Sequence, residues 1–181
     1  MDDIVKAALK KWPNVPHCYD WLGLDARGDW YLRDEQVQAA GGFPQVKGSR
    51  IVHDKLKEFI QRNYDHDERG AWFFQNGPQR VYVMLELSPL VLGVQRVQGA
   101  TGAAAFKVET HTGQPVDEVR STWVDEQGRL YLDTELGFGV VRSLDMDVAA
   151  DAVEQGLWAP GDALSSELPE RFTYVRHPVQ G

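Results

Sequence analysis

The most regular hydrophobic pattern of the chain lies between residues 72 and 87, where two runs of β-branched and aromatic residues flank Asn76-Gly77-Pro78. An Asn-Gly pair between such runs is typical of a β-hairpin. Because side chains alternate between the two faces of a strand, a turn of even length assigns every second residue to one face. One face is predicted to be core: Trp72, Phe74, Val81, Val83, Leu85 and Leu87. The other mixes aromatic and polar side chains, as on a sheet surface partly covered by a helix or a partner: Phe73, Gln75, Arg80, Tyr82, Met84 and Glu86.

Three segments have the periodicity of an amphipathic helix instead. Residues 2–11 form a short one behind an N-terminal aspartate, and residues 146–156 form another that ends at Gly156. The clearest covers residues 52–62, where apolar side chains recur on one helical face: Val52, Leu56, Phe59 and Ile60. The buried stripe of the helix at 146–156 is predicted to be Val148, Ala149, Ala152 and Val153.

Shorter β-rich runs predict further strands. The runs 21–24 and 30–32 flank Asp25-Ala26-Arg27-Gly28, where Asp at the first and Gly at the fourth position favour a type I turn, so we predict a hairpin. Residues 39–49 hold several Gly and a Pro and are predicted to be a loop. Other strands are expected at residues 90–94, 105–110, 119–125 and 129–134, with an edge strand at 171–175.

The segment Asp25 to Leu32 is echoed by Asp125 to Leu132, with Asp, Gly, Tyr and Leu at matching places. Chance recurrence of a common turn and a true duplication both explain this echo. We predict an α+β fold of two small similar subdomains, each a mainly antiparallel sheet with one packed helix. The small-residue stretch 98–104 is the expected boundary, giving subdomains 1–98 and 99–181, the second with an irregular C-terminal tail; one continuous domain 1–181 is the alternative.

Two sets of segments resemble known families. The stretch 47–62 with Gly70–Phe74 and Val81–Pro89 looks like bacterial proteins of unknown function built from two repeated α+β subdomains. The blocks Trp12–Tyr19 and Gln75–Arg80 look like a proteobacterial group of unknown function. The first resemblance implies a signalling or regulatory role, and neither transfers any site residue.

The charge of the chain narrows the class of partner. A formal net charge of -8 without a basic stripe makes nucleic acid and anionic membrane surfaces poor partners. The single Cys18 excludes an internal disulfide framework and fits a reducing compartment. No long apolar run or secretory signal is apparent, so a cytoplasmic location is expected. The remaining classes of partner are a protein and a small-molecule ligand, and the sequence leaves the oligomeric state open.

Candidate catalytic and metal-ligating groups are sparse. His17-Cys18 suggests a nucleophile, but neighbouring residues of an extended strand point apart, and a small buried thiol is the commoner role. His53, His66 and His111 lie near several carboxylates without the spacing of a zinc or EF-hand site. The glycine-rich stretches 41–48 and 99–102 do not match a phosphate loop. We therefore expect no catalytic residue, no metal and no cofactor.

The aromatic and arginine residues suggest binding. Arg80 lies at the turn of the hairpin predicted at residues 72–87, which we call the central hairpin, and its guanidinium offers a planar set of N–H donors to an anion. The predicted ligand- or partner-binding residues are Phe73, Arg80, Tyr82, Met84, Trp12 and Trp30. The first hypothesis is a non-enzymatic binding or regulatory domain that takes a protein segment or small ligand at the seam between the halves or on an open sheet edge. Two alternatives are a hydrolase using His53 or His66 with neighbouring carboxylates, with or without metal, and a structural homo-oligomer.

Overall fold

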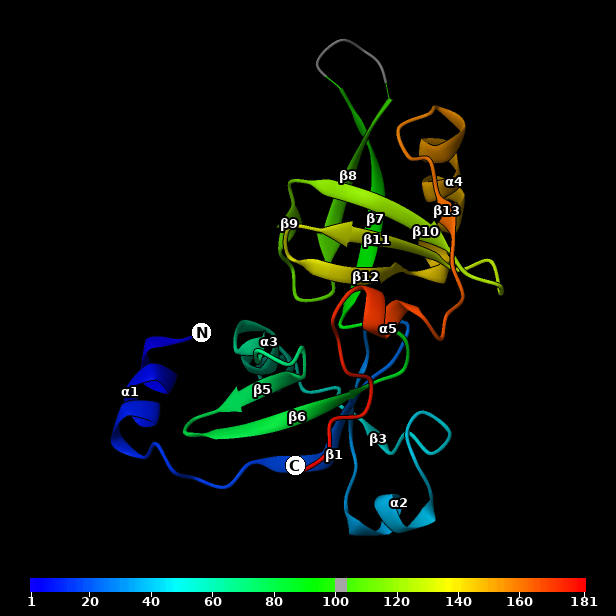
Figure 1. The fold of residues 1–181 in the computed structure, drawn as a ribbon. Helices are drawn as coiled ribbons and strands as arrows, with labels where there is room; N and C mark the ends of the chain where they lie inside the picture. Colours follow the sequence, from blue (N-terminus) through cyan, green and yellow to red (C-terminus); the bar gives the residue numbers. More distant parts are fainter. Residues whose placement is uncertain (100–103) are drawn as a thin grey trace. The chain divides into compact units, whose positions relative to one another are not determined.

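The computed structural model describes residues 1–99 and 104–181 (Figure 1). The chain forms two compact units, one made of residues 1–25, 29–87 and 173–181, the other of residues 26–28 and 88–172. This division differs from the boundary expected at 98–104. Residues 100–103 of that stretch lie outside the described residues, and Gln98 and Ala104 on either side pair with each other in neighbouring strands.

The first unit is built on a mixed sheet in which only β1 and β6 run parallel. In the described residues this sheet has six strands in the order β3-β2-β1-β6-β5-β4, and α3 packs on β5. Its elements are α1 (Asp3–Lys11), β1 (Cys18–Leu24), β2 (Trp30–Leu32), α2 (Glu35–Ala40), β3 (Ser49–Arg50), α3 (Asp54–Arg62), β4 (Tyr64–His66), β5 (Trp72–Asn76) and β6 (Gln79–Leu85).

The second unit has a described sheet of seven strands in the order β13-β10-β11-β12-β7-β8-β9, with α4 packed on β7. Strands β12 and β7 run parallel, as do β10 and β13, and the other pairs are antiparallel. Its elements are β7 (Leu90–Gln98), β8 (Ala104–Thr110), β9 (Pro115–Val116), β10 (Val119–Val124), β11 (Leu130–Thr134), β12 (Gly137–Val141), η1 (Ser143–Asp145), α4 (Met146–Glu154), β13 (Gly161–Asp162) and α5 (Leu168–Arg171).

The two sheets share one topology. When the first six strands of each unit are numbered in chain order, both sheets read 3-2-1-6-5-4, with strands 1 and 6 parallel and every other pair antiparallel. The predicted α+β fold of two similar, mainly antiparallel subdomains is confirmed.

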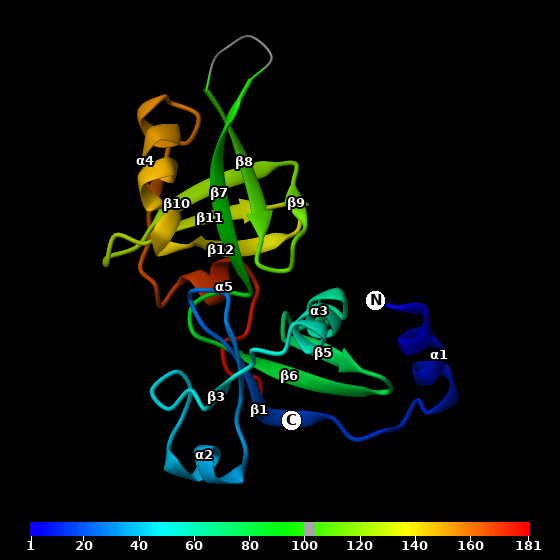
Figure 2. The ribbon, with the colours of Figure 1, turned by 180° about the vertical axis from the view of Figure 1, so that it is seen from behind.

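The two sheets differ in the link from strand 3 to strand 4. In the first unit it spans residues 51–63 and contains α3. In the second unit only Asp117 and Glu118 join β9 to β10, and three Cα steps cover at most about 11 Å. Such a short link between strands on opposite sides of the strand order forces the sheet to curl. Figures 1 and 2 accordingly show β10, β11 and β12 crossing one side of β7 and β8.

The central hairpin follows the predicted alternation. Phe74 pairs with Val81 on one face and Phe73 with Tyr82 on the other, as an even-length turn requires. Both faces are buried, however: Val83 and Leu85 are inaccessible, and Phe73, Tyr82 and Met84 are almost as deeply buried. The second face is covered by the chain itself, since Tyr19 of β1 and Val175 pack against Ala71, Phe73 and Tyr82.

The predicted helices are confirmed as α1, α3 and α4, with Ala149 and Ala152 as the buried residues of α4. The short helices α2 and α5 were not predicted, and α2 overlaps the start of the predicted loop. The edge strand expected at 171–175 is wrong. Helix α5 ends there at Arg171, Thr173 has a positive φ of 52°, and Val175 makes only an isolated bridge to Ala71.

The echoed segments form the same turn. The carboxylates of Asp25 and Asp125 are buried, and each accepts a backbone N–H four residues on and a tyrosine hydroxyl six residues on, at 3.1 Å from Tyr31 and 2.9 Å from Tyr131. The turns nevertheless join strands 1 and 2 of the first sheet but strands 4 and 5 of the second. The echo therefore marks a recurring turn, not equivalent positions of the two sheets.

Candidate functional site

The β10 edge of the second sheet opens into a hollow, which we call the fork. Strand β13 pairs with β10 at only two positions, Trp123 with Gly161 and Val124 with Asp162. The preceding residues of the two segments diverge and enclose about 410 Å³. The fork is lined by Val119, Arg120, Ser121, Thr122 and Trp123 on one side and by Leu157, Trp158, Ala159 and Gly161 on the other.

Backbone hydrogen-bonding groups face the fork. The carbonyl of Val124 accepts the N–H of Ala163 at 3.0 Å, so Val124 directs its backbone groups toward β13. Backbone direction alternates along a strand beside an antiparallel partner, so Thr122 directs its N–H and C=O the same way. The parallel pair of Trp123 with Gly161 directs the N–H of Gly161 to the C=O of Thr122, whereas no hydrogen bond between described residues outside the strand pairs reaches the N–H of Thr122. The edge of β10 thus carries a backbone donor, the N–H of Thr122, beside an open space.

The opposite wall of the fork is apolar. Trp158 is buried, and its ring lies 6.4 Å from that of Phe106. Leu157 is 59% exposed directly after the turn that ends α4. At the closed end, a Cβ on Gly161 would lie 3.1 Å from the Trp123 ring, so glycine allows the close approach of β13 to β10. The fork therefore joins a polar strand edge to an apolar wall.

The corresponding strand of the first sheet has a protected edge. Strand β4 is strand 4 of its unit, as β10 is of the second, and it is flanked only by β5 in the described residues. The carboxylate of Asp65 accepts the backbone N–H of His66 at 2.8 Å. A charged side chain that occupies an edge donor is one way in which proteins protect a strand edge. Strand β10 has no such cap at Thr122 in the described residues.

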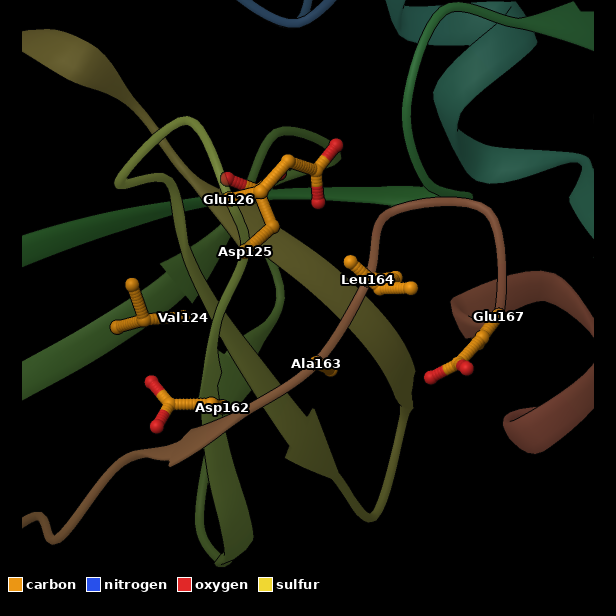
Figure 3. Close-up of a pocket in the computed structure, with 7 residues that line it drawn as sticks. All are labelled: Val124, Asp125, Glu126, Asp162, Ala163, Leu164 and Glu167. Atoms are coloured by element: carbon orange, nitrogen blue, oxygen red, sulfur yellow. The ribbon is translucent and has the colours of Figure 1, made fainter.

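A second hollow of about 400 Å³, which we call the acidic hollow, lies at the other end of the β10–β13 pair (Figure 3). It is lined by Val124, Asp125, Glu126, Asp162, Ala163, Leu164 and Glu167. Figure 3 shows the carboxylates of Glu126, Asp162 and Glu167 pointing in different directions. Among the described residues no three His, Cys, Asp or Glu side chains are grouped to hold a metal ion.

Two of the four acids of this hollow are already engaged. Arg129 donates from Nε to Asp125 at 2.6 Å, and the backbone N–H of Ser165 donates to Glu126 at 2.8 Å. Burial raises the pKa of Asp125, but hydrogen bonds from Arg129, Tyr131 and Gln127 outweigh it and lower the pKa overall. The pKa of Glu126 is lowered by its hydrogen bonds to Ser165. Both groups are therefore held as carboxylates, a poor state for a general acid.

The six residues predicted to bind a ligand lie in the first unit and do not form one surface. Phe73, Tyr82, Met84 and Trp30 are buried, so their side chains offer no surface to a partner. Trp12 is half exposed beyond the end of α1, with the ammonium of Lys11 at 4.5 Å from its ring. Arg80 is half-buried, with its guanidinium 4.3 Å from the centre of the Phe73 ring.

The residues considered for catalysis are held in local contacts. Burial, followed by the charge of Asp20, raises the pKa of the Cys18 thiol, the opposite of what a nucleophile needs. His53 caps α3 by accepting the N–H of Leu56, and His66 contacts the carbonyl of Asp67. Burial lowers the pKa of His111 to about 3, so this imidazole is neutral near pH 7 and its Nδ1 accepts the N–H of Val91.

Sequence reasoning missed the fork. Its residues fall in a correctly predicted strand and in a segment, 157–161, that follows a correctly predicted helix. The pair Leu157-Trp158 after Gly156 was the available signal, because two large apolar residues outside any predicted element need a surface to pack on. What the sequence did not contain was the register that lets β13 pair at two residues and then diverge from β10.

The fold and the fork together define an α+β protein of two sheet units with an open strand edge and no assembled catalytic set among the described residues. The chain belongs to the family DUF2944, described as "Protein of unknown function (DUF2946)", whose model matches residues 1–179. No described helix has the length and apolar character needed to cross a membrane.

Two solved structures resemble the chain. One is a DUF1285 family protein from Silicibacter pomeroyi DSS-3, with 12% identity, a TM-score of 0.53 and coverage of 83% of this chain and 84% of that one. The other is a DUF1285 family protein from Shewanella baltica OS155, with 16% identity, a TM-score of 0.49 and coverage of 72% and 91%. No curated protein matches the chain significantly. The predicted resemblance to bacterial proteins of unknown function is confirmed, and at these identities the first likeness concerns the fold alone.

Proposed function

We propose that the chain is a non-enzymatic binding domain that takes an extended polypeptide segment into the fork, where the segment adds as a strand to the edge of β10. The observation that carries this proposal is the N–H of Thr122, which has no partner among the described residues, beside a hollow of about 410 Å³. An extended peptide supplies the backbone acceptor that this N–H needs, and main-chain hydrogen bonds of this kind are the basis of recognition by strand addition.

The walls of the fork favour a peptide with an apolar side chain. Alternate side chains of an added strand point to opposite faces, so one of them meets the wall of Leu157 and Trp158. Burial of apolar surface gains about 25 cal/mol per Å², and Leu157 has most of its side chain still exposed. The backbone of the peptide fixes its direction, and this side chain supplies much of its affinity.

Charge favours a basic partner. The whole chain carries a net charge of -8, and Asp162 and Glu167 place exposed carboxylates in the acidic hollow at the other end of the β10–β13 pair. Arg120, the cation of the fork, is already paired with Glu118 at 3.3 Å. The partner segment should therefore carry lysine or arginine beside its apolar residue, because complementary charge accelerates association and excludes acidic competitors.

A role in regulation or signalling follows from this mode of binding, because strand addition joins two proteins without chemical change. We also infer that the two units arose by duplication. The shared strand order 3-2-1-6-5-4 supports this, whereas the echoed turns do not, because they lie at different strands of the two sheets. On this view one copy kept a protected strand 4 and the other acquired a binding edge.

The decisive experiment selects peptides from a random displayed library on the full chain and measures their affinity for two variants. Thr122→Pro removes the outward N–H but no hydrogen bond to β11, whereas Thr122→Val keeps the N–H and the shape of the side chain. Selected peptides should alternate apolar and basic residues and should bind Thr122→Pro at least about tenfold more weakly, since a lost hydrogen bond and a steric block act together. Unchanged affinity for Thr122→Pro would overturn the proposal.

A matched pair of charge variants tests the wall. Leu157→Asp places a carboxylate in the fork, and Leu144→Asp places one on another exposed leucine, 88% accessible, before α4. We expect the first variant to weaken peptide binding and the second to leave it unchanged. Equal effects of both variants would show that net charge, and not the fork, controls binding. Failure to select any peptide on the wild-type chain would also count against strand addition.

A further inference from the structure

We propose a second, independent binding site on the first unit, in which His17 and Arg80 hold an oxyanion group, either phosphate or carboxylate. The site belongs to the second face of the central hairpin, which is otherwise filled by aromatic rings. It differs from the fork in unit, in charge and in ligand. Three observations carry it: the placement of the imidazole beside the guanidinium, the fixed orientation of the guanidinium, and the engagement of Asp67 by other partners.

Strand register brings the imidazole of His17 and the guanidinium of Arg80 together. Cys18 pairs with Val81 in the parallel contact of β1 and β6, which places His17 beside Arg80 on the neighbouring face. The side-chain amide of Gln79 donates to the carbonyl of Pro16 at 3.0 Å, so the chain stays in register before β1 begins. Side chains at paired positions lie on one face with Cβ atoms about 5 Å apart.

Ring contacts confirm which face this is. Tyr19 and Tyr82 are stacked with centroids 4.8 Å apart, and the His17 imidazole meets the edge of Tyr82 at 5.7 Å. These three side chains alternate with Cys18 and Val81, which belong to the opposite face. The imidazole of His17 is exposed and the guanidinium of Arg80 is half-buried, so a ligand reaches both from solvent.

The Arg80 guanidinium is held in one orientation. It lies 4.3 Å from the centre of the Phe73 ring, whose buried position fixes the surface beneath the cation. A guanidinium that lies over a ring keeps the N–H groups at its edge free, and two of these N–H groups match two oxygens of a carboxylate or phosphate. Among the described residues no carboxylate forms an ion pair with Arg80, although the chain has 27 acidic against 19 basic residues.

The acid that contacts Tyr82 of this cluster is occupied. Asp67 accepts the hydroxyl of Tyr82 at 3.1 Å, the backbone N–H groups of Arg69 and Ala71, and the guanidinium of Arg69 at 3.4 Å. Burial raises the pKa of Asp67, but these hydrogen bonds lower it overall, so the carboxylate is retained for these partners. It therefore neutralises Arg69 and leaves the charge of Arg80 to an external anion.

The test follows the histidine ring resonances of the full chain by NMR during separate titrations with inorganic phosphate and with acetate at constant ionic strength. The His17 ring signals should shift and saturate, whereas those of His53, exposed at the start of α3, should not. The anion that saturates at lower concentration identifies phosphate or carboxylate as the preferred group. Arg80→Gln should weaken the His17 response at least tenfold.

Two further variants make the outcome specific. Arg69→Gln removes a cation that already has a carboxylate partner and should leave the His17 response unchanged. Arg80→Lys keeps the charge but loses the planar set of N–H donors. Its affinity for the anion should fall between those of the wild type and Arg80→Gln. The proposal is overturned if His17 shifts equally in Arg80→Gln, if His53 responds in parallel, or if the shifts grow linearly without saturation.

Discussion

The two sheets have the same strand order but are completed by different parts of the chain. In the first unit the segments that complete the sheet come from far away in sequence: Val175 donates its N–H to Gly70 at 3.0 Å, and Leu85 donates to Arg176 at 2.8 Å. In the second unit such segments lie closer in sequence. The link Asp117–Glu118 is held by Glu135, whose carboxylate accepts both backbone N–H groups, at 2.7 and 3.0 Å.

The buried turn carboxylates show the same contrast. Asp25 is neutralised by Lys47, whose ammonium also reaches Glu86 at 3.2 Å, so a loop 22 residues away completes the turn. Asp125 is neutralised by Arg129, only four residues on. Equal topology therefore does not mean equal dependence on long-range contacts. The first unit should respond strongly to changes in its distant C-terminal segment, and the second to changes within its own turns.

The largest expected effect comes from Gly70→Ala. Gly70 has a positive φ of 76°, and a Cβ there would collide with the carbonyl oxygen of Thr173, so the C-terminal segment could not stay in place. Unfavourable φ and the clash together should cost about 3 kcal/mol. Hydrogen exchange should locate the loss of protection in β5, β6 and residues 173–181.

Gly128→Ala is the matched control in the second unit. Gly128 has nearly the same φ, 75°, but no atom lies within 4 Å of the added Cβ. Only the cost of the unfavourable φ remains, so the free energy of unfolding measured by urea denaturation should fall by about 1 kcal/mol. Equal losses in the two variants would show that the C-terminal segment does not complete the first unit.

A smaller effect, dependent on pH, is expected from Asp125→Asn. The folded pKa of Asp125 is lowered, so its carboxylate stabilises the fold above the unfolded pKa of about 4 and loses this contribution as pH falls through the folded value. At pH 7 the variant should be less stable by about 2 kcal/mol, because a buried carboxylate with several donors is replaced by an amide.

As pH falls below the unfolded pKa of about 4 and through the lowered folded pKa, the difference in stability between wild type and Asp125→Asn should shrink toward zero in urea denaturation series. Asp117→Asn, on the exposed link before β10, is the control for a general effect of charge. A difference that stays constant from pH 7 to pH 2 would contradict the role of the ionised carboxylate, and would point to the shape of the turn instead.

The sequence predicted what depends on local pattern. Alternation identified the hairpin at 72–87, helical periodicity identified α3 and α4, and the Asp-x-x-Gly pattern identified two turns that prove to be built alike. These features are encoded within a few residues. The failures concern contacts between distant residues: Tyr19 and Val175 cover the face of Phe73 and Tyr82 that the pattern left partly open, and no periodicity links residues so far apart.

The candidate sites divide in the same way. Arg80 was predicted to bind a ligand from its chemistry at a hairpin end, and the neighbouring His17 of the proposed site became visible only with the parallel register of β1 and β6. The fork was not predicted at all, because a hollow results from the divergence of two backbones and leaves no mark in composition. The cap on β4 likewise depends on the rotamer of Asp65.

The smallest expected change in stability, and the most direct test of the contrast between β4 and β10, comes from Asp65→Ala. Removal of the carboxylate frees the N–H of His66 on an exposed strand, where water replaces the lost acceptor, so the cost should stay below about 1 kcal/mol. The freed donor should exchange faster with solvent and turn β4 into a second edge able to pair with added strands. Asp65→Asn keeps an acceptor oxygen at the same place and should preserve slow exchange at His66. The alternative outcome is that the alanine variant still exchanges slowly and gains no binding to peptides selected on the fork. In that case the cap does not explain why the edge of β4 is closed and that of β10 is open, and the topology of β4 is the cause.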